Sequence, residues 1–399
     1  MNPKDTQAKK QPHPLALLYP TQLFAGAMLI SLGPLLDPIL RDLHIPLAEG
    51  GILSLGFFLG RVLGVLLLNF GLARVRLKSI LVGAAWVQAA ALIVAGLLAP
   101  GLWPLFGALL VAGLAAVIPN AISGVWVGAH VRTGTERAML LILAFFALGV
   151  VAAPLAIGAA LSLGGTWRWV FVGEAAFSAI MAMALTTSRL PDVKGRENLR
   201  LRQLREMAGF APRLLAVMLV AIFIYVGSET VLGVWLAKFE IDVHGASPSL
   251  AAISVTLLWT GITLGRYLTV PLTRWVRPSR LLVVFAAVQT VFILGTVLSP
   301  TLVASLACVF LAGLGASVCF PLIGGYTSRF PGWYAGVAFS GMMLAGTLGS
   351  TVFSYLIGPV AEALSLRLAI GLTAVLPGLV IILALALDRV SGERASSRV

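Results

Sequence analysis

The stretch Gly56-Phe-Phe-Leu-Gly60-Arg61-Val-Leu63 returns 205 residues later as Gly261-Ile-Thr-Leu-Gly265-Arg266-Tyr-Leu268. Both copies place two glycines four residues apart, with an arginine directly after the second, inside a long apolar run. Further pairs recur at an offset of 200 residues: Ala112-Gly-Leu114 with Ala312-Gly-Leu314, and Gly149 and Gly158 with Gly349 and Gly358. Several motifs repeated at offsets of 200 to 205 residues indicate that the chain contains two copies of one unit.

The composition places the whole chain in a membrane. Of its 399 residues, 59% are hydrophobic and only 11% are charged, which is more apolar surface than a soluble protein of this size can bury. Runs of about 20 apolar residues recur, each long enough to cross about 30 Å of hydrocarbon as a helix. Only helices satisfy their own backbone in lipid across such segments, so we predict an all-α membrane protein with twelve transmembrane helices. The spans are expected at residues 15–40, 47–69, 79–99, 102–126, 137–163, 167–188, 213–238, 248–272, 279–299, 301–325, 333–360 and 366–388.

The basic residues set the expected orientation. The chain has 28 Lys and Arg against 15 Asp and Glu, a net charge of +13. The cations lie almost entirely in the short links between apolar runs, which is typical of cytoplasmic loops and not of a nucleic-acid-binding surface. With the N-terminus inside, 22 of them fall in inner loops and tails and 4 in outer loops. We therefore expect a multi-pass protein of the plasma (inner) membrane with both termini in the cytoplasm.

The repeat and a charged link between spans 6 and 7 divide the chain. Two parallel six-span units related by an axis along the membrane normal are the sequence form of the major facilitator fold. Small residues four apart on spans 2, 8 and 11 predict close helix packing, either because these spans form the sliding contact between the halves or as generic helix packing. Pro119 and Pro321 are expected to bend spans 4 and 10. The expected parts are a cytoplasmic tail at 1–14, an N-terminal half at 15–188, a cytoplasmic linker at 189–212, a C-terminal half at 213–388 and a cytoplasmic tail at 389–399.

One acid lies deep in the seventh span, within Ile222-Phe-Ile-Tyr-Val-Gly-Ser-Glu-Thr-Val-Leu-Gly-Val-Trp235. A charge at the depth of Glu229 costs roughly 2.5 kcal/mol or more, so such a side chain usually faces a wet cavity or a partner. Burial also favours the neutral form of a carboxyl group, which lets it take up and release a proton. We expect Glu229 to couple protons and to bind substrate; a structural pair with a neighbouring helix is the alternative.

Two further motifs give the chain a family resemblance. Trp167-Arg-Trp-Val-Phe171 and the loop Leu72–Leu81 resemble motifs of the major facilitator superfamily, although Ala73 stands where the loop's acid is usual and Arg76 where a glycine is. Tyr225-Val-Gly-Ser-Glu229 followed by Trp235, together with Gly261–Arg266, is similar to the branch of fucose/glucose/galactose–proton symporters.

The resemblance implies a proton-coupled carrier of sugars or similar polyols. Fucose-permease-like carriers use acids on spans 1 and 4, whereas this chain has Asp37 near the end of span 1 and Asn120 on span 4. The coupling site has therefore moved in this chain, or coupling is absent.

In this fold spans 1, 4, 7 and 10 line a central cavity, so polar residues on or near them are the candidates for substrate contacts. Span 7 offers an acid, two hydroxyls and an aromatic ring within one arc, which is the mixture that a sugar requires. Arg61 and Arg266 are predicted gating residues, with snorkelling and substrate anchoring as alternatives, and Glu174 on span 6 is expected to be structural. The predicted substrate-binding residues are Gln22, Asn120, Tyr225, Ser228, Glu229, Trp235 and Trp259.

The sequence gives little support for a disulfide, a metal site or a catalytic cluster. Cys308 and Cys319 lie about 16 Å apart along one helix, too far for a disulfide. The histidines are all expected in tails or loops: His13, His44, His130 and His244. We therefore predict no catalytic cluster, metal site or cofactor, which argues against a membrane-embedded enzyme.

The preferred function is a secondary active transporter that works by alternating access, because a repeat supplies two halves that can rock; this also disfavours a channel. Its expected partners are a small-molecule substrate of the sugar or polyol class, protons and the lipid bilayer, and the expected state is a monomer. The alternative is a major facilitator exporter of drugs or other amphiphilic compounds, with an apolar lining that includes Phe145, Phe146, Met342 and Met343.

Overall fold

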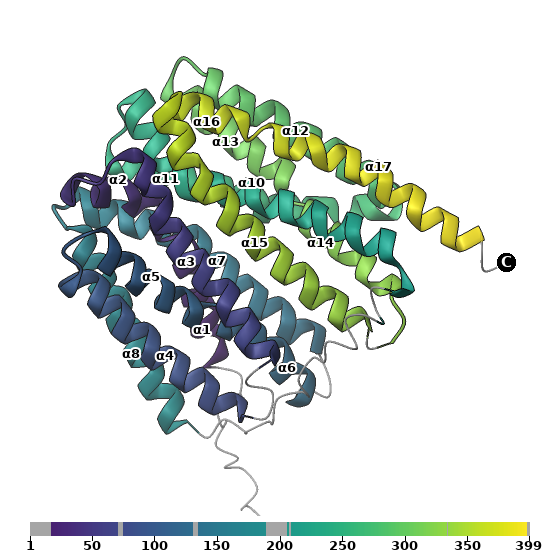
Figure 1. Cartoon of the computed structure of the whole chain (residues 1–399), viewed down its shortest axis with the longest axis horizontal. Coiled ribbons are helices and arrows are strands. Elements are labelled where there is room, and N and C mark those ends of the chain that lie inside the picture. Colours follow the sequence, from purple (N-terminus) through teal and green to yellow (C-terminus); the bar gives the residue numbers. More distant parts are fainter. Residues whose placement is uncertain are drawn as a thin grey trace, which may run out of the picture.

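The computed structural model describes residues 17–70, 75–130, 135–188, 206, 209–332 and 334–396. Within these ranges the chain is helical and contains no strand (Figure 1). Eleven of the described helices are long and apolar enough to cross a membrane, and a bent pair of shorter helices brings the count to twelve. The prediction of an all-α protein with twelve spans is confirmed.

Each half contains six spans, some of them broken into two helices. The N-terminal half comprises α1 (Leu18–Ile30), α2 (Leu32–Asp42), α3 (Leu47–Phe70), α4 (Leu77–Ile93) with its continuation η2 (Val94–Leu98), α5 (Leu102–Ala116), α6 (Ile118–His130), α7 (Thr135–Ser162) and α8 (Trp167–Thr187). The C-terminal half comprises α10 (Pro212–His244), α11 (Pro248–Thr269), η3 (Pro271–Arg274), α12 (Pro278–Leu298), α13 (Leu302–Ala316), α14 (Cys319–Gly325), η4 (Tyr326–Arg329), α15 (Tyr334–Ala363), α16 (Leu366–Leu372) and α17 (Val375–Ser396).

The two halves are built alike. Helices α5 and α13 begin and end 200 residues apart, and each is followed by a short second piece, α6 or α14. Equivalent pairs also pack together: α3 on α5 and α11 on α13, α1 on α7 and α10 on α15, α4 on α8 and α12 on α17. Pro119 and Pro321 lie in the second pieces, where proline's missing N–H interrupts the helical hydrogen bonds. Each of these spans is broken into two helices just before its proline, while the predicted bends stay a prediction.

The repeated glycines pack helices within each half. A Cβ atom on Gly60 would collide with the backbone carbonyl of Leu110 on α5, and one on Gly261 with that of Phe310 on α13. Gly349 on α15 packs in the same way on α10 of its own half. These glycines therefore serve helix packing within each half and not the contact between the halves. The predicted spans do meet across the halves, span 2 with span 11 through α3 and α15, and span 8 with span 5 through α11 and α7.

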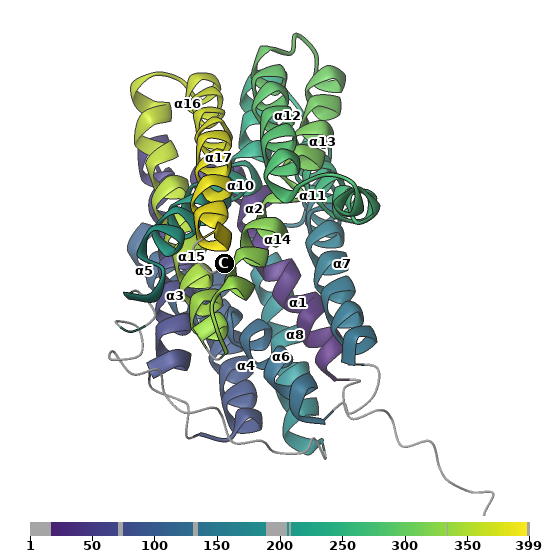
Figure 2. The same cartoon turned by 90° about the vertical axis from the view of Figure 1, so that its right-hand side faces the viewer.

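The halves meet near one end of the bundle, which we call the Lys238 end because that side chain lies there; the opposite end is the Arg61 end. Figures 1 and 2 show the helices of the two halves close together toward the Lys238 end and diverging toward the Arg61 end. Small residues let the two backbones approach at the Lys238 end. The close approaches are Gly33 to Gly233, Gly51 to Tyr355, Gly158 to Ala252 and Gly358 to Ala48.

Candidate functional site

Glu229 lies midway along α10 and is only 7% exposed. Its Oε1 atom is buried and has no hydrogen-bond partner among the described residues. Two groups on the same half act on the carboxyl group, the guanidinium of Arg266 on α11 and the hydroxyl of Tyr225 one turn away. A buried acceptor without a partner is uncommon in proteins, so this atom marks a place where a ligand, a water or a proton belongs.

Trp259 on α11 supplies the complementary group. It is 8% exposed, and its Nε1 atom is buried and unpaired within the part of the chain that the structure describes. A Cβ atom on Gly233 would lie 3.7 Å from this nitrogen and 3.4 Å from the side chain of Ile30 on α1. Gly233 is one helical turn beyond Glu229, so an unpaired acceptor and an unpaired donor flank the same short stretch of α10. Ile30 adds a wall from the other half, and we call these four residues the central site.

Three other predicted residues on α10 have their polar atoms engaged within the C-terminal half in this conformation. The Tyr225 hydroxyl donates to the carbonyl of Ala316, the last residue of α13 before the break, at 2.9 Å. The Ser228 hydroxyl accepts from Gln289 Nε2 at 3.4 Å. The Trp235 indole donates to the carbonyl of Ser354 on α15 at 3.0 Å, and its ring also packs on Gly50 of the other half.

Gln22 on α1 connects two spans of the N-terminal half. Its Nε2 atom donates to the carbonyl of Pro119 at 2.9 Å and to the hydroxyl of Ser123 at 2.5 Å. These bonds hold α1 against the break between α5 and α6. Asn120, the next residue after Pro119, is partly exposed. The two candidates therefore lie close together on the N-terminal half.

The two predicted gating arginines have different surroundings. The Arg61 guanidinium lies 5.9 Å from the ring centre of Phe57 on the same helix, and its buried Nη1 has no hydrogen-bond partner in the described ranges. Arg266 is exposed and acts electrostatically on Glu229 of its own half. Arg266 thus belongs to the surroundings of the central site in this conformation.

A polar cluster at the Lys238 end was not recognised in the sequence. Lys238 Nζ on α10 lies 2.9 Å from Asp37 on α2, which joins the two halves, and 2.6 Å from Asp242. Arg41 lies 3.0 Å from the same Asp37. A second contact between halves is the hydrogen bond from the backbone N–H of Ala48 to Glu362 at 2.8 Å. We call the Asp37–Lys238 pair the Lys238 bridge.

The prediction that every histidine lies in a tail or loop is wrong for His244. It is the last residue of α10, and its Nδ1 lies 2.7 Å from Glu240, a fully buried acid that also accepts from Ser305 at 2.6 Å. Helix α10 continues past residue 238, the predicted end of span 7, as far as His244. This histidine therefore lies on the last turn of a helix and not in a loop. His13 and the side chain of His130 lie outside the described residues. No group of three metal-binding side chains occurs in the described ranges.

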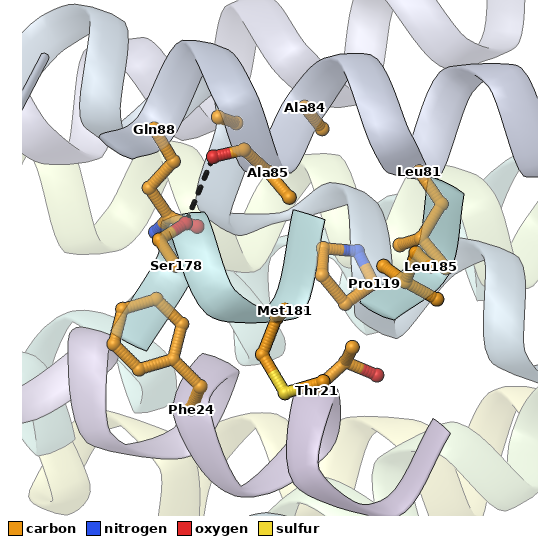
Figure 3. A pocket seen from close by; sticks show the side chains of 11 residues that line it. Thr21, Phe24, Leu81, Ala84, Ala85, Gln88, Pro119, Ser178, Met181 and Leu185 are labelled. Atoms are coloured by element: carbon orange, nitrogen blue, oxygen red, sulfur yellow. Dashed lines mark hydrogen bonds between the residues drawn. The ribbon is translucent and has the colours of Figure 1, made fainter. Parts of the chain in front are cut away.

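A small pocket lies inside the N-terminal half, between α1, α4 and α8 (Figure 3). It is lined mainly by apolar side chains such as Phe24 and Met181, with Gln88 and Ser178 at one side. The Ser178 hydroxyl donates to the carbonyl of Ala85 at 2.9 Å, whereas Gln88 Nε2 has no partner in the described part of the chain. This pocket is separate from the central site, because its lining comes from one half alone.

The fold and the contacts between its halves define a class, a membrane transporter made of two six-helix units that meet at one end. The chain belongs to the Major Facilitator Superfamily, whose family model matches residues 18–332. The predicted family is confirmed.

Individual relatives are distant. A glucose/galactose transporter of Brucella abortus biovar 1 is 27% identical over 239 residues, and this match covers 57% of each of the two chains. The fold is similar to that of a bacterial homologue of the human lysosomal transporter Spinster, solved in an inward-facing and unoccupied conformation, with a TM-score of 0.75, 18% identity and coverage of 94% of this chain and 96% of that one. For the nucleoside transporter NupG the TM-score is 0.72 at 15% identity, with 94% and 98% covered.

Proposed function

We propose that the protein is a proton-coupled secondary transporter that moves a sugar or polyol across the inner membrane by alternating access. The main support is the pair of buried atoms without partners at the central site, Glu229 Oε1 and Trp259 Nε1, next to Ile30 of the other half. Each such atom costs about 1–3 kcal/mol unless a ligand or water fills its hydrogen bond. A polyol suits both, since each hydroxyl can donate and accept, and the indole offers a flat apolar face to ring C–H groups. The Brucella relative's name supports the sugar class.

Glu229 is the residue to which we assign the proton. Glu229 is buried inside the protein, and Arg266 on the neighbouring helix α11 acts electrostatically on its carboxyl group. Opening the site to water relieves the burial, so the two conformations hold the proton with different affinity. A protonated Glu229 can donate to a substrate hydroxyl, and an ionised one is stabilised by Arg266 instead. Proton binding and substrate binding are thereby coupled at one carboxyl group.

In an alternating-access cycle the Lys238 bridge acts as a gate at one end of the molecule. We assign the Arg61 end to the cytoplasm, because the basic loops and tails lie on that side. With this orientation the conformation is closed toward the outside, and the Lys238 bridge is the outer gate that must break when the other state forms. Arg61 and Arg266 lie toward the opposite end, where we expect them to act when the cytoplasmic side closes.

Export of drugs or amphiphiles has less support. Met342 is fully buried, and Phe145 stacks on Tyr19 with ring centres 5.0 Å apart. These side chains take part in helix packing in this conformation, whereas a drug exporter needs them along a wide apolar lining.

Ligand-induced stabilisation of the purified protein tests the substrate class, because a ligand that binds the folded state raises its melting temperature by mass action. The panel contains hexoses, polyols, nucleosides and lipophilic cations. We expect a hexose or polyol to raise the melting temperature, and the exposed-acid variant Glu49→Gln to respond like the wild type. If only lipophilic cations stabilise the protein, the exporter replaces the proposal.

A further inference from the structure

The first span breaks at Ser31, where α1 and α2 meet at an angle of 46°. The residues on either side of the break both touch Gly233 of the other half. Ile30 would lie 3.4 Å from a Cβ atom there, and Gly33 packs on the Gly233 carbonyl. The angle at Ser31 therefore decides how the first span meets the central site.

Ser31 is bonded to an acid on another helix. Its hydroxyl oxygen lies 2.9 Å from the carbonyl of Ala27 and within hydrogen-bond distance of Glu174 Oε1 on α8. The second carboxyl oxygen, Glu174 Oε2, is buried and without a partner in the ranges that the structure covers. Helix α8 is otherwise attached to α1 here by apolar contact, with Phe24 and Phe177 stacked at 4.8 Å.

The single hydrogen of the Ser31 hydroxyl decides which protonation state of Glu174 fits this contact. A serine hydroxyl has one hydrogen, so it can donate to Ala27 or to Glu174 but not to both. If Glu174 is protonated, it donates to Ser31, Ser31 donates to Ala27, and every bond in the chain is made. If Glu174 is ionised, Ser31 must turn its hydrogen to the carboxylate and give up its bond to Ala27, while a charge is left buried. The bent first span thus fits the protonated acid.

Charged neighbours do not change this preference, because they lie toward the ends of the bundle. On α2, Asp37 pairs with Lys238 and with Arg41, and Asp42 pairs with Arg168 of α8 at 3.4 Å. On α4, Lys78 bonds to the carbonyl of Ser188 at 2.6 Å, at the far end of α8. On α7, Arg137 is exposed in the first turn at the Arg61 end. Gln88 on α4 and the described part of α1 contribute no charge near Glu174.

We propose that Glu174 is a second proton-binding site, distinct from Glu229, whose proton holds the first span in its bent form and the Lys238 end closed. Loss of the proton turns the Ser31 hydroxyl to the carboxylate and breaks its bond to Ala27, which lets the angle between α1 and α2 change and favours opening at the Lys238 end. Glu174 is then a positioning residue, since it acts on the central site through Ser31 and Ile30. The inference depends on alternating access and not on the identity of the substrate.

The test measures the distance across the Lys238 end as a function of pH without substrate. Spin labels are attached at Leu163→Cys and Leu364→Cys, two exposed positions at that end on different halves, in a chain whose Cys308 and Cys319 are replaced by alanine. We expect the wild-type background to show a short distance at low pH and a growing population of a longer distance as the pH rises. Glu174→Gln, which still donates a hydrogen bond to Ser31, should keep the short distance at every pH, and Glu49→Gln should behave as the wild type.

Other outcomes overturn the inference. It is wrong if the background shows no change with pH, or if Glu174→Gln changes with pH as the background does. Should Glu174→Gln aggregate on gel filtration, Ser31→Ala decides instead, since it must lose the pH response. A response that is lost in Glu229→Gln and kept in Glu174→Gln assigns the proton to the central site, which refutes this inference and leaves the proposed function standing.

Discussion

At the scale of single residues, the central site depends on one glycine. Gly233 has no side chain, so the indole of Trp259 and the side chain of Ile30 both approach α10 at a point one turn from Glu229. The atoms Glu229 Oε1 and Trp259 Nε1 have no partner among the described residues, whereas the hydroxyl of the neighbouring Tyr225 has found one on α13. A site of this kind binds by completing hydrogen bonds that the protein leaves open.

The Trp259 indole N–H can be removed alone. Trp259→Phe keeps an aromatic ring and loses the donor, so we expect substrate affinity to fall about tenfold, the effect of losing one hydrogen bond of about 1–1.5 kcal/mol. The protein should melt at nearly the wild-type temperature, because the nitrogen has no partner among the described residues to lose. Isothermal titration measures the affinity, and Trp103→Phe, an exposed position, is the control. Unchanged affinity in Trp259→Phe would remove the indole from the binding site.

At the scale of helices, packing within each half depends on glycines that touch a neighbouring backbone. A Cβ atom on Gly113 of α5 would meet the carbonyl of Phe57 on α3, and one on Gly313 of α13 the carbonyl of Leu258 on α11. Backbone cannot yield as a flexible side chain can, so these contacts fix the distance between the helices.

Gly113→Ala should therefore destabilise the protein, by about 1–3 kcal/mol as overpacking of a core does. Gly107→Ala, six residues earlier on the same helix, is the matched control, since a Cβ atom there meets nothing within 4 Å. Thermal unfolding in detergent should show a lower melting temperature for Gly113→Ala and an equal or higher one for Gly107→Ala. Equal melting temperatures for the two variants would contradict the packing shown by the structure.

Much of the helical architecture was predictable from the sequence for a physical reason. Gly113 and Gly313, repeated at an offset of 200 residues, meet equivalent neighbours, the carbonyls of Phe57 and Leu258, so this repetition reports the fold directly. The match of Gly56–Leu63 with Gly261–Leu268 is one turn out of register, because it is Gly60 that packs on α5 as Gly261 packs on α13. The direction in which single side chains point was harder to predict from the sequence. Tyr225 and Trp235 share an arc of α10 with Glu229, but α10 is covered on most sides, and which atoms stay unpaired depends on partners such as Ala316 and Ser354 on other helices.

Contacts between the halves could not be predicted from either half alone. Lys238 stands at the end of the predicted span 213–238 and Asp37 near the end of span 1, and nothing in sequence spacing places them together. Their pairing follows from how the two halves dock at one end, which a helical pattern does not encode. The same holds for Glu174, whose link to Ser31 requires α8 to pack beside the break in the first span.

At the scale of the whole molecule, the Lys238 bridge holds one end closed. Both side chains of the Asp37–Lys238 pair are largely buried, at 9% and 12% exposed. Lys238→Ala leaves Asp37 with only the exposed Arg41, so we expect the population open at this end to rise about tenfold, a shift of about 1.4 kcal/mol.

Chemical labelling from outside the cell measures that shift. A cysteine at Ile30, in a chain whose two native cysteines are replaced by alanine, should react with a membrane-impermeant maleimide about ten times faster with Lys238→Ala than without it. Arg41→Gln, which removes the exposed partner of Asp37, should change the rate little. Equal labelling rates with and without Lys238→Ala would show that the bridge is not a gate.

Uptake into proteoliposomes tests the central claim that Glu229 couples a proton to substrate movement. With the interior at higher pH than the outside, the wild type and Glu49→Gln should accumulate the labelled sugar identified by thermal stabilisation. Glu229→Gln should fail to accumulate it while still exchanging it across the membrane without a gradient. Accumulation by Glu229→Gln at the wild-type level would contradict the account.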